Sequence, residues 1–328
     1  MAVFQRIMCK VLGLFIPETA LVFLDDGVVL GPRASEVEDE DELNEHGVRV
    51  IVERHMKDVA RMMRALADAG LTVSGTKTHV AMHSVVVLGH QCSGDGRRPV
   101  EEKVRKIANW ATPRDTTELR AFLRVCVFFR QWVKNFSTVA APLYLLLRKN
   151  ARYVWGTEQD MAFVRLKQAL QNAPVLRAPD YGDPRRPLVL STDASPEGAG
   201  GVLSQKDVNR HRYCIRFESA KFSNTQRKYS QIKRELYAVY LMVRKLRIYL
   251  YGVHFVLEVD ARPLIGMLNI PKLANDVAGR WIAYIKSFDF ELRHVKGVAN
   301  TAADGLSREK FEVDSVAVDE SGKIQVDG

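Results

Sequence analysis

The sequence predicts an α/β protein, with an α+β N-terminal part followed by a domain in which helices flank a mixed β-sheet. Between residues 188 and 294, short β-branched runs such as LVLSTDAS and HFVLEVD alternate with a long amphipathic stretch. In the N-terminal part, two short apolar runs lie on either side of Asp25 and Asp26. Acidic residues and a glycine between two such runs are typical of a hairpin.

Residues 1–98 are expected to form the first domain. Apolar residues recur at helical spacing in residues 1–20 and again from residue 52 to residue 66. The predicted hairpin at residues 21–30 lies between these two helices. The acidic run at residues 34–45 has no apolar periodicity, which predicts a solvated loop.

Residues 99–178 are expected to form a basic helical segment. Of the charged residues between 97 and 186, 18 are Lys or Arg and 8 are Asp or Glu, so this part contributes most of the net charge of +9. Pro113 should end a first helix, and a long second helix should follow with Thr116 or Thr117 as its N-cap. Aromatic residues at helical spacing in this helix favour core packing. The basic side chains interleaved with them are candidates for nucleic-acid binding: Arg120, Arg124, Arg130 and Lys134.

A Pro-rich stretch, APDYGDPRRP, predicts a linker before a domain at residues 186–308, and residues 309–328 read as a weakly patterned tail. Three glycines after the first strand, Gly198, Gly200 and Gly201, are expected to turn the chain back. The expected order is strands at 188–192, 200–204 and 212–217, a helix at 225–246, a strand at 254–259, helices, a strand at 289–294 and a helix at 301–307.

Four carboxylates in this domain are expected to meet at one edge of the sheet. Asp193 and Asp260 follow apolar strands, Glu235 lies on the long helix, and Asp304 opens the last helix. Four acids close together repel one another strongly unless cations bind them. Oxygen ligands favour Mg²⁺ or Mn²⁺, and two such ions are typical of phosphodiester hydrolysis.

Four stretches resemble, in order and spacing, the ribonuclease H domain of Gypsy-type LTR retrotransposon reverse transcriptases: TDAS, YSQIKRELYAVYLMVRKLRIYLYG, VLEVDARPL and HVKGVANTAADGLSR. The resemblance implies two-metal cleavage of the RNA strand of RNA–DNA hybrids, with the four carboxylates as metal ligands. It also implies that His294 is a mobile proton shuttle or assists product release. Packing at the end of a strand is the alternative role for His294.

FLDD, with FQRIM before it, is similar to the aromatic-x-Asp-Asp motif of the reverse transcriptase palm. This resemblance implies that Asp25 and Asp26 are metal ligands. A polymerase of this family needs further segments upstream of the hairpin, and only about twenty residues precede it here. We therefore expect a partial palm that does not polymerise by itself. The basic helical segment is similar to the family's thumb and connection, with Arg124 in place of the usual glycine.

The expected partner is an RNA–DNA hybrid or another nucleic acid, held by the basic residues. The missing polymerase half and other products of a polyprotein are further expected partners. No run approaches the roughly 18 apolar residues of a membrane helix, and no signal peptide is evident. The four scattered cysteines read as reduced packing residues: Cys9, Cys92, Cys126 and Cys214. We expect an intracellular protein without membrane contact, in a cytoplasmic particle or in the nucleus.

The alternative is a non-catalytic, nucleic-acid-binding remnant of a retroelement. Such a remnant would keep the fold and the basic surface without turnover. The presence of all four carboxylates favours the enzyme, whereas Arg124 and the short polymerase part favour the remnant.

Overall fold

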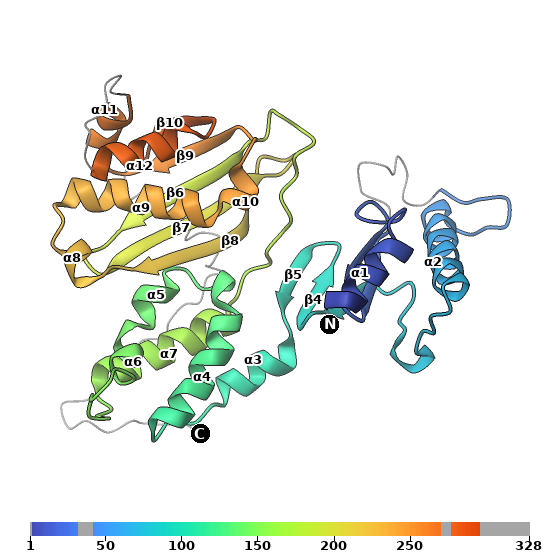
Figure 1. Ribbon diagram of the computed structural model, residues 1–328, viewed down its shortest axis with the longest axis horizontal. Helices are drawn as coiled ribbons and strands as arrows, with labels where there is room; N and C mark the ends of the chain where they lie inside the picture. Colours follow the sequence, from blue (N-terminus) through green and yellow to red (C-terminus); the bar gives the residue numbers. More distant parts are fainter. Residues whose placement is uncertain (1, 32–41, 270–276, 296–328) are drawn as a thin grey trace, which may run out of the picture. The chain divides into compact units, whose positions relative to one another are not determined.

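The structure, a computed structural model, describes residues 2–31, 42–269 and 277–295. The chain divides into two compact units, Met1–Glu101 and Glu102–Gly328 (Figure 1). Each unit has a hydrophobic core of its own. The finer expected division of the second unit, at residues 178–186, remains a prediction.

The first unit contains the expected hairpin. The turn is at Leu24 and Asp25, and Leu24 has a positive φ of 55°. Met8 and Met62, from the helices on either side of the hairpin, form a small core with Leu12, which directly follows the first helix. Residues 71–83 do not form the strand that β-branched residues there would favour, and a separate three-stranded sheet follows. The elements are α1 (Ala2–Val11), β1 (Ala20–Phe23), β2 (Asp26–Val29), α2 (Val50–Asp68), a 3₁₀ turn (Gly75–Lys77), β3 (Ser84–Val87), β4 (His90–Ser93) and β5 (Gly96–Pro99).

The second unit is built on a five-stranded mixed sheet of order β10-β9-β6-β7-β8, which confirms the predicted fold class. Three strands form an antiparallel meander, and two further strands add in parallel beside the first. The strands are β6 (Leu188–Ala194), β7 (Gly198–Lys206), β8 (Arg212–Lys221), β9 (Phe255–Val259) and β10 (Phe290–His294). The three glycines expected in a turn lie inside β7 instead.

Helix α9 (Gln231–Lys245) packs on one face of this sheet, where Leu236, Val239 and Val243 are fully buried. The predicted helix at 225–246 is in fact two helices. Three residues separate the end of the short α8 (Asn224–Arg227) from the start of α9. Arg234 donates a hydrogen bond of 3.2 Å to the carbonyl oxygen of Arg227, which satisfies a backbone group freed by the break. The same layer contains α10 (Arg247–Leu250), α11 (Pro263–Asn269) and α12 (Val277–Lys286).

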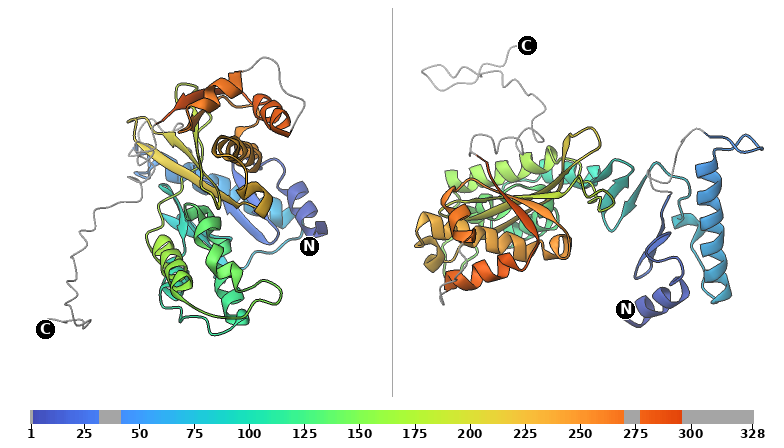
Figure 2. Two further views of the ribbon diagram at one scale, coloured as in Figure 1. Left: turned by 90° about the vertical axis from the view of Figure 1, so that its left-hand side faces the viewer. Right: turned by 90° about the horizontal axis from the view of Figure 1, so that it is seen from above.

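The other face of the sheet, at β7 and β8, is covered by the basic helical segment (Figure 2). Phe122, Phe129 and Trp132 are buried there against Val202 and Phe217 of the sheet. The packing role predicted for the aromatic residues is therefore confirmed for these three. The elements are α3 (Glu101–Ala108), α4 (Thr116–Phe128), a 3₁₀ turn (Arg130–Trp132), α5 (Phe136–Val139), α6 (Ala141–Leu145) and α7 (Thr157–Gln171).

Two expectations for α4 were wrong. Its N-cap is Asp115, whose Oδ1 accepts hydrogen bonds from the backbone N–H groups of Thr117 (2.7 Å) and Glu118 (2.9 Å). A carboxylate at this position also interacts favourably with the helix dipole. The helix ends at Phe128, and the chain then turns through Asn135, which has a left-handed φ of 54°.

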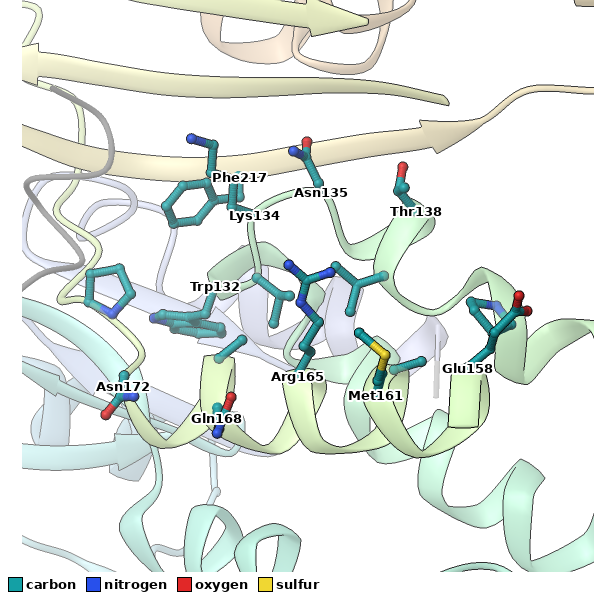
Figure 3. Close-up of a pocket in the computed structure, with 16 residues that line it drawn as sticks. Trp132, Lys134, Asn135, Thr138, Glu158, Met161, Arg165, Gln168, Asn172 and Phe217 are labelled. Carbon is teal, nitrogen blue, oxygen red and sulfur yellow. The ribbon is translucent and has the colours of Figure 1, made fainter. Parts of the chain in front are cut away.

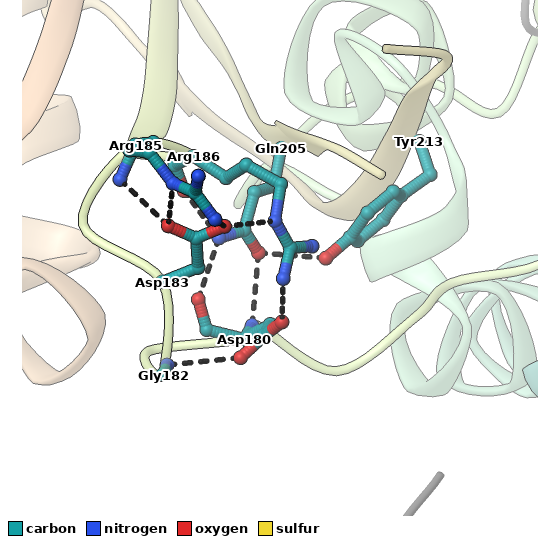
Figure 4. Close-up of polar contacts among 7 residues, drawn as sticks. All are labelled: Asp180, Gly182, Asp183, Arg185, Arg186, Gln205 and Tyr213. Carbon is teal, nitrogen blue, oxygen red and sulfur yellow. Dashed lines mark hydrogen bonds and ion pairs between the residues drawn. The ribbon is translucent and has the colours of Figure 1, made fainter. Parts of the chain in front are cut away.

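The predicted linker is hydrogen-bonded to the end of β7, an inner strand of the sheet (Figure 4). Gln205, a buried residue of β7, donates hydrogen bonds of 2.6 Å to the carbonyl oxygens of Asp180 and Arg186. Its own oxygen accepts from the N–H of Asp180 at 2.8 Å. Hydrogen bonds from Arg185 and Arg186 lower the pKa of Asp183. The Pro-rich, polar sequence of this stretch could not predict these contacts, because they depend on a residue of a distant strand.

Among the described residues, no helix is both long enough and apolar enough to cross a membrane. Cys126 and Cys214 are buried, and burial raises the pKa of each thiol to about 12. Cys9 is exposed, so the packing role expected for all four cysteines does not apply to it.

Candidate active site

Three of the four predicted carboxylates come together in the second unit. Asp193 lies near the end of β6, and Asp260 directly follows β9. These strands are parallel neighbours, so their carboxyl ends meet at one edge of the sheet. Glu235 reaches the same region from α9, and the charges of the three groups act on one another. Asp304, the fourth predicted ligand, lies outside the described residues.

Glu235 is the most perturbed of these acids. Its side chain is only 6% exposed, and this burial, together with the negative charges of Asp260 and Asp193, raises its pKa to about 8. Arg234 opposes the rise only weakly. A buried carboxyl group beside two other acids is protonated near neutral pH unless a cation compensates its charge.

Asp193 also has a raised pKa, because the surrounding protein displaces water from it and Asp260 repels its charge. Lys134 and the backbone N–H of Ala194 act in the opposite direction. The effect of Lys134 shows that a residue of the basic helical segment lies within electrostatic reach of the carboxylate cluster.

The donor set is suited to divalent cations. All three groups offer oxygen, which is the ligand that Mg²⁺ and Mn²⁺ prefer. Positive charge bound between Asp193, Glu235 and Asp260 would relieve the repulsion that raises the pKa of Glu235. As arranged, no three His, Cys, Asp or Glu side chains in the described part of the chain are gathered closely enough to hold an ion.

His294 is tied to the same edge of the sheet. Its Nε2 lies 2.9 Å from the carbonyl oxygen of Asp260. Because a carbonyl can only accept, we assign the proton in this contact to Nε2, which leaves Nδ1 of the neutral side chain as a hydrogen-bond acceptor. The side chain is exposed at the end of β10, which argues against a packing role.

The four predicted nucleic-acid-binding residues have different surroundings. Arg120 and Arg124 are exposed on α4, and Lys134 lies near Asp193. Arg130 instead forms an ion pair with Glu218 of β8. A nucleic-acid contact by Arg130 stays a prediction, because the structure gives this residue a partner inside the protein.

Glu218 has three basic neighbours. Burial alone would raise its pKa, but Arg130 and Lys245 (Nζ at 3.2 Å) and the N–H of Ser219 outweigh that effect and lower it. Arg216 approaches the other carboxylate oxygen at 3.3 Å. A buried carboxylate compensated in this way is ionised, and it fastens the basic helical segment to the sheet.

In the loop that follows Trp132, the sequence predicted Lys134 as a candidate site residue but not Asn135. The Asn135 side chain lies directly against Gly200, and a Cβ atom at Gly200 would overlap its Oδ1. Gly200 is the partner of Asp193 in the β6–β7 pairing. Nearby, the N–H of Ser137 donates to the hydroxyl of Ser219 at 2.9 Å. Glycine inside a strand was the available signal, since it often marks a close backbone approach.

Asp25 and Asp26 lie at the tip of the β1–β2 hairpin, as the sequence predicted, and both are exposed. Within the part of the chain that the structure describes, no third acid, His or Cys joins them to form a metal site. Their role as metal ligands stays a prediction.

The chain is similar to proteins of mobile elements. The family model described as an RNase H-like domain found in reverse transcriptase matches residues 155–257, which include Asp193 and Glu235. The Retrovirus-related Pol polyprotein from transposon 412 of Drosophila melanogaster is 28% identical over 93% of this chain. The Transposon Tf2-3 polyprotein of Schizosaccharomyces pombe is 32% identical over 81% of it. The matched parts are 23% and 20% of those polyproteins.

Solved structures show the same fold. The foamy viral protease-reverse transcriptase in complex with dsDNA matches 90% of this chain and 58% of its own, with a TM-score of 0.70 and 22% identity. The same enzyme in complex with an RNA/DNA hybrid matches 90% of this chain and 38% of its own, with a TM-score of 0.70 and 23% identity. At this level of identity the likeness concerns the fold.

Proposed function

We propose that this chain, a homologue of Gypsy-type transposon polyproteins that contains the RNase H-like domain found in reverse transcriptase, hydrolyses the RNA strand of RNA–DNA hybrids. The observation that carries the proposal is the meeting of Asp193, Glu235 and Asp260 at one edge of the sheet. Carboxylates that repel one another in the free protein are typical of a site that binds cations and acts on a phosphodiester.

Asp193, Glu235 and Asp260 would hold two Mg²⁺ or Mn²⁺ ions together with Asp304. When bound, such ions supply the positive charge that activates water and stabilises the leaving oxygen, here the 3′-oxygen of the RNA. The charge of Asp260 acts on both Asp193 and Glu235. We propose Asp193, on the middle strand β6 of the sheet, as the central ligand of this set. The buried position of Glu235 keeps water from competing for its oxygens.

The basic residues would hold the polyanionic substrate. Arg120 and Arg124 are exposed on α4, and Lys134 is positioned beside Asp193. Phosphate contacts by such side chains fix the register of a nucleic acid without reading its sequence. Selectivity for a hybrid would come from contacts with the 2′-hydroxyl groups of one strand only.

The proposal is tested with the purified chain and an end-labelled RNA–DNA hybrid in Mg²⁺. We expect cleavage of the RNA strand and none of the DNA strand, with products that end in a 3′-hydroxyl. Double-stranded RNA of the same sequence is the control, and it should stay intact. Binding of the hybrid without cleavage, in either Mg²⁺ or Mn²⁺, would contradict the proposal and favour the non-catalytic remnant.

His294→Ala is expected to lower kcat by roughly tenfold to a hundredfold, because a proton acceptor beside the site is lost. KM for the hybrid should change little, since His294 contacts the backbone of Asp260 and not the basic helical segment. His211→Ala, at an exposed His in the β7–β8 connection, is the matched control. An unchanged kcat in His294→Ala would rule out the proposed role.

A further inference from the structure

A pocket of about 750 Å³ opens between α7 and the loop that connects Trp132 with α5 (Figure 3). Phe217 of β8 forms part of its wall. Its volume is within the range of roughly 300–1,000 Å³ that is usual for small-molecule and cofactor sites. Of the residues that line it, only Lys134 has been given a role in substrate binding above.

The lining combines apolar and hydrogen-bonding groups. Trp132 and Phe217 are largely buried and present apolar surface to the pocket. On the side of α7, Arg165, Gln168 and Asn172 are exposed, and Figure 3 shows the guanidinium of Arg165 directed into the space. Amide side chains pair with the edges of bases, and a guanidinium group stacks on a base or binds a phosphate.

The pocket adjoins the carboxylate cluster. Lys134 lines it, and the same side chain acts electrostatically on Asp193. Asn135 also lines it, and Asn135 lies against Gly200, the pairing partner of Asp193. A nucleic-acid strand at Asp193 would therefore lie near Lys134, which also lines this pocket.

The charge of the pocket favours an anionic ligand. Lys134 and Arg165 are basic, and Glu158 is the one acid among the residues that line it. Within the described parts of the chain, Arg165 forms no ion pair with any acid. A guanidinium group that is directed into a partly apolar pocket and not already neutralised attracts a phosphate or an aromatic ring.

We propose that this pocket binds one unpaired nucleotide of a substrate strand that extends beyond the hybrid at the carboxylate cluster. The base packs against the apolar wall and pairs with the amides of Gln168 and Asn172, while Arg165 contacts its phosphate or stacks on its ring. Lys134 holds the connecting phosphate. The inference deepens the proposed function, because it assumes that the hybrid lies at Asp193.

The test measures the binding of fluorescent RNA–DNA hybrids to the full chain in EDTA, so that no cleavage occurs. One hybrid is blunt, and the others carry a short single-stranded extension of DNA or of RNA at one end. We expect an extension to improve the affinity of the wild-type chain by about tenfold, which is the effect of stacking and contacting one base. The DNA and RNA arms identify the strand that enters the pocket.

Arg165→Gln should lose this advantage and bind the blunt hybrid as the wild-type chain does. Arg152→Gln, at an exposed arginine outside the pocket, is the matched control and should keep it. No advantage in the wild-type chain, or an advantage that survives in Arg165→Gln, would overturn the inference. Cleavage of the blunt hybrid in Mg²⁺ is measured separately. If the chain binds extended hybrids through Arg165 but does not cleave, the proposed activity is wrong and the inference about the pocket stands.

Discussion

Asp193→Asn is expected to lower the rate of hybrid cleavage by roughly a thousandfold or more, the effect of removing a group that stabilises the charge of the transition state. The amide has the shape of the carboxylate but no charge, so it is a poor ligand for a hard cation. Affinity for the hybrid in EDTA should not fall, because removal of a negative charge near Lys134 also removes repulsion of the phosphates.

The variant is compared with the wild-type chain by single-turnover cleavage in Mg²⁺ and by thermal unfolding in EDTA. Asp289→Asn, at an exposed acid before β10, is the matched control and should cleave normally. In EDTA, Asp193→Asn should be at least as stable as the wild-type chain, since Asp193 and Asp260 repel each other. If Asp193→Asn cleaves at the wild-type rate, Asp193 is not the central metal ligand.

Without divalent metal, the wild-type chain should lose stability as the pH rises from about 4.5 to about 8. In the folded protein the pKa of Glu235 is about 8, compared with its ordinary value of 4.5. Between these values the folded state holds a proton that the unfolded state has released. The stability that protonated Glu235 contributes is therefore fully present below pH 4.5. It is lost as the pH rises toward about 8, at about 1.4 kcal/mol per pH unit.

Glu235→Gln should remove this pH dependence, because the amide does not titrate. At pH 8 in EDTA the variant should therefore unfold at a higher Tm than the wild-type chain, with a difference of a few kcal/mol in the free energy of unfolding. Mg²⁺ should raise the Tm of the wild-type chain more than that of the variant. Parallel pH profiles of Tm for the two chains would show that Glu235 is not held protonated in the fold.

The sequence by itself determined the order of the elements and the place of the acids. Alternating β-branched runs and apolar residues at helical spacing depend on near neighbours in the chain, so β6, β9 and α9 were predictable. The position of Asp193 and Asp260 at the ends of two strands was likewise visible. Once the strands are parallel neighbours, the meeting of these residues follows.

Only the tertiary structure decided how the basic helical segment joins the sheet. Arg130 and Glu218 are 88 residues apart in the chain, and nothing near either residue indicates the other. The contact between Asn135 and Gly200 and the pocket lined by Arg165 also join residues that are far apart in the sequence. The raised pKa of Glu235 also depends on the fold, because it is caused by burial and by two acids that are distant in the sequence but close in space. Local pattern selects helices and strands, whereas the environment of a side chain depends on residues that only folding brings near it.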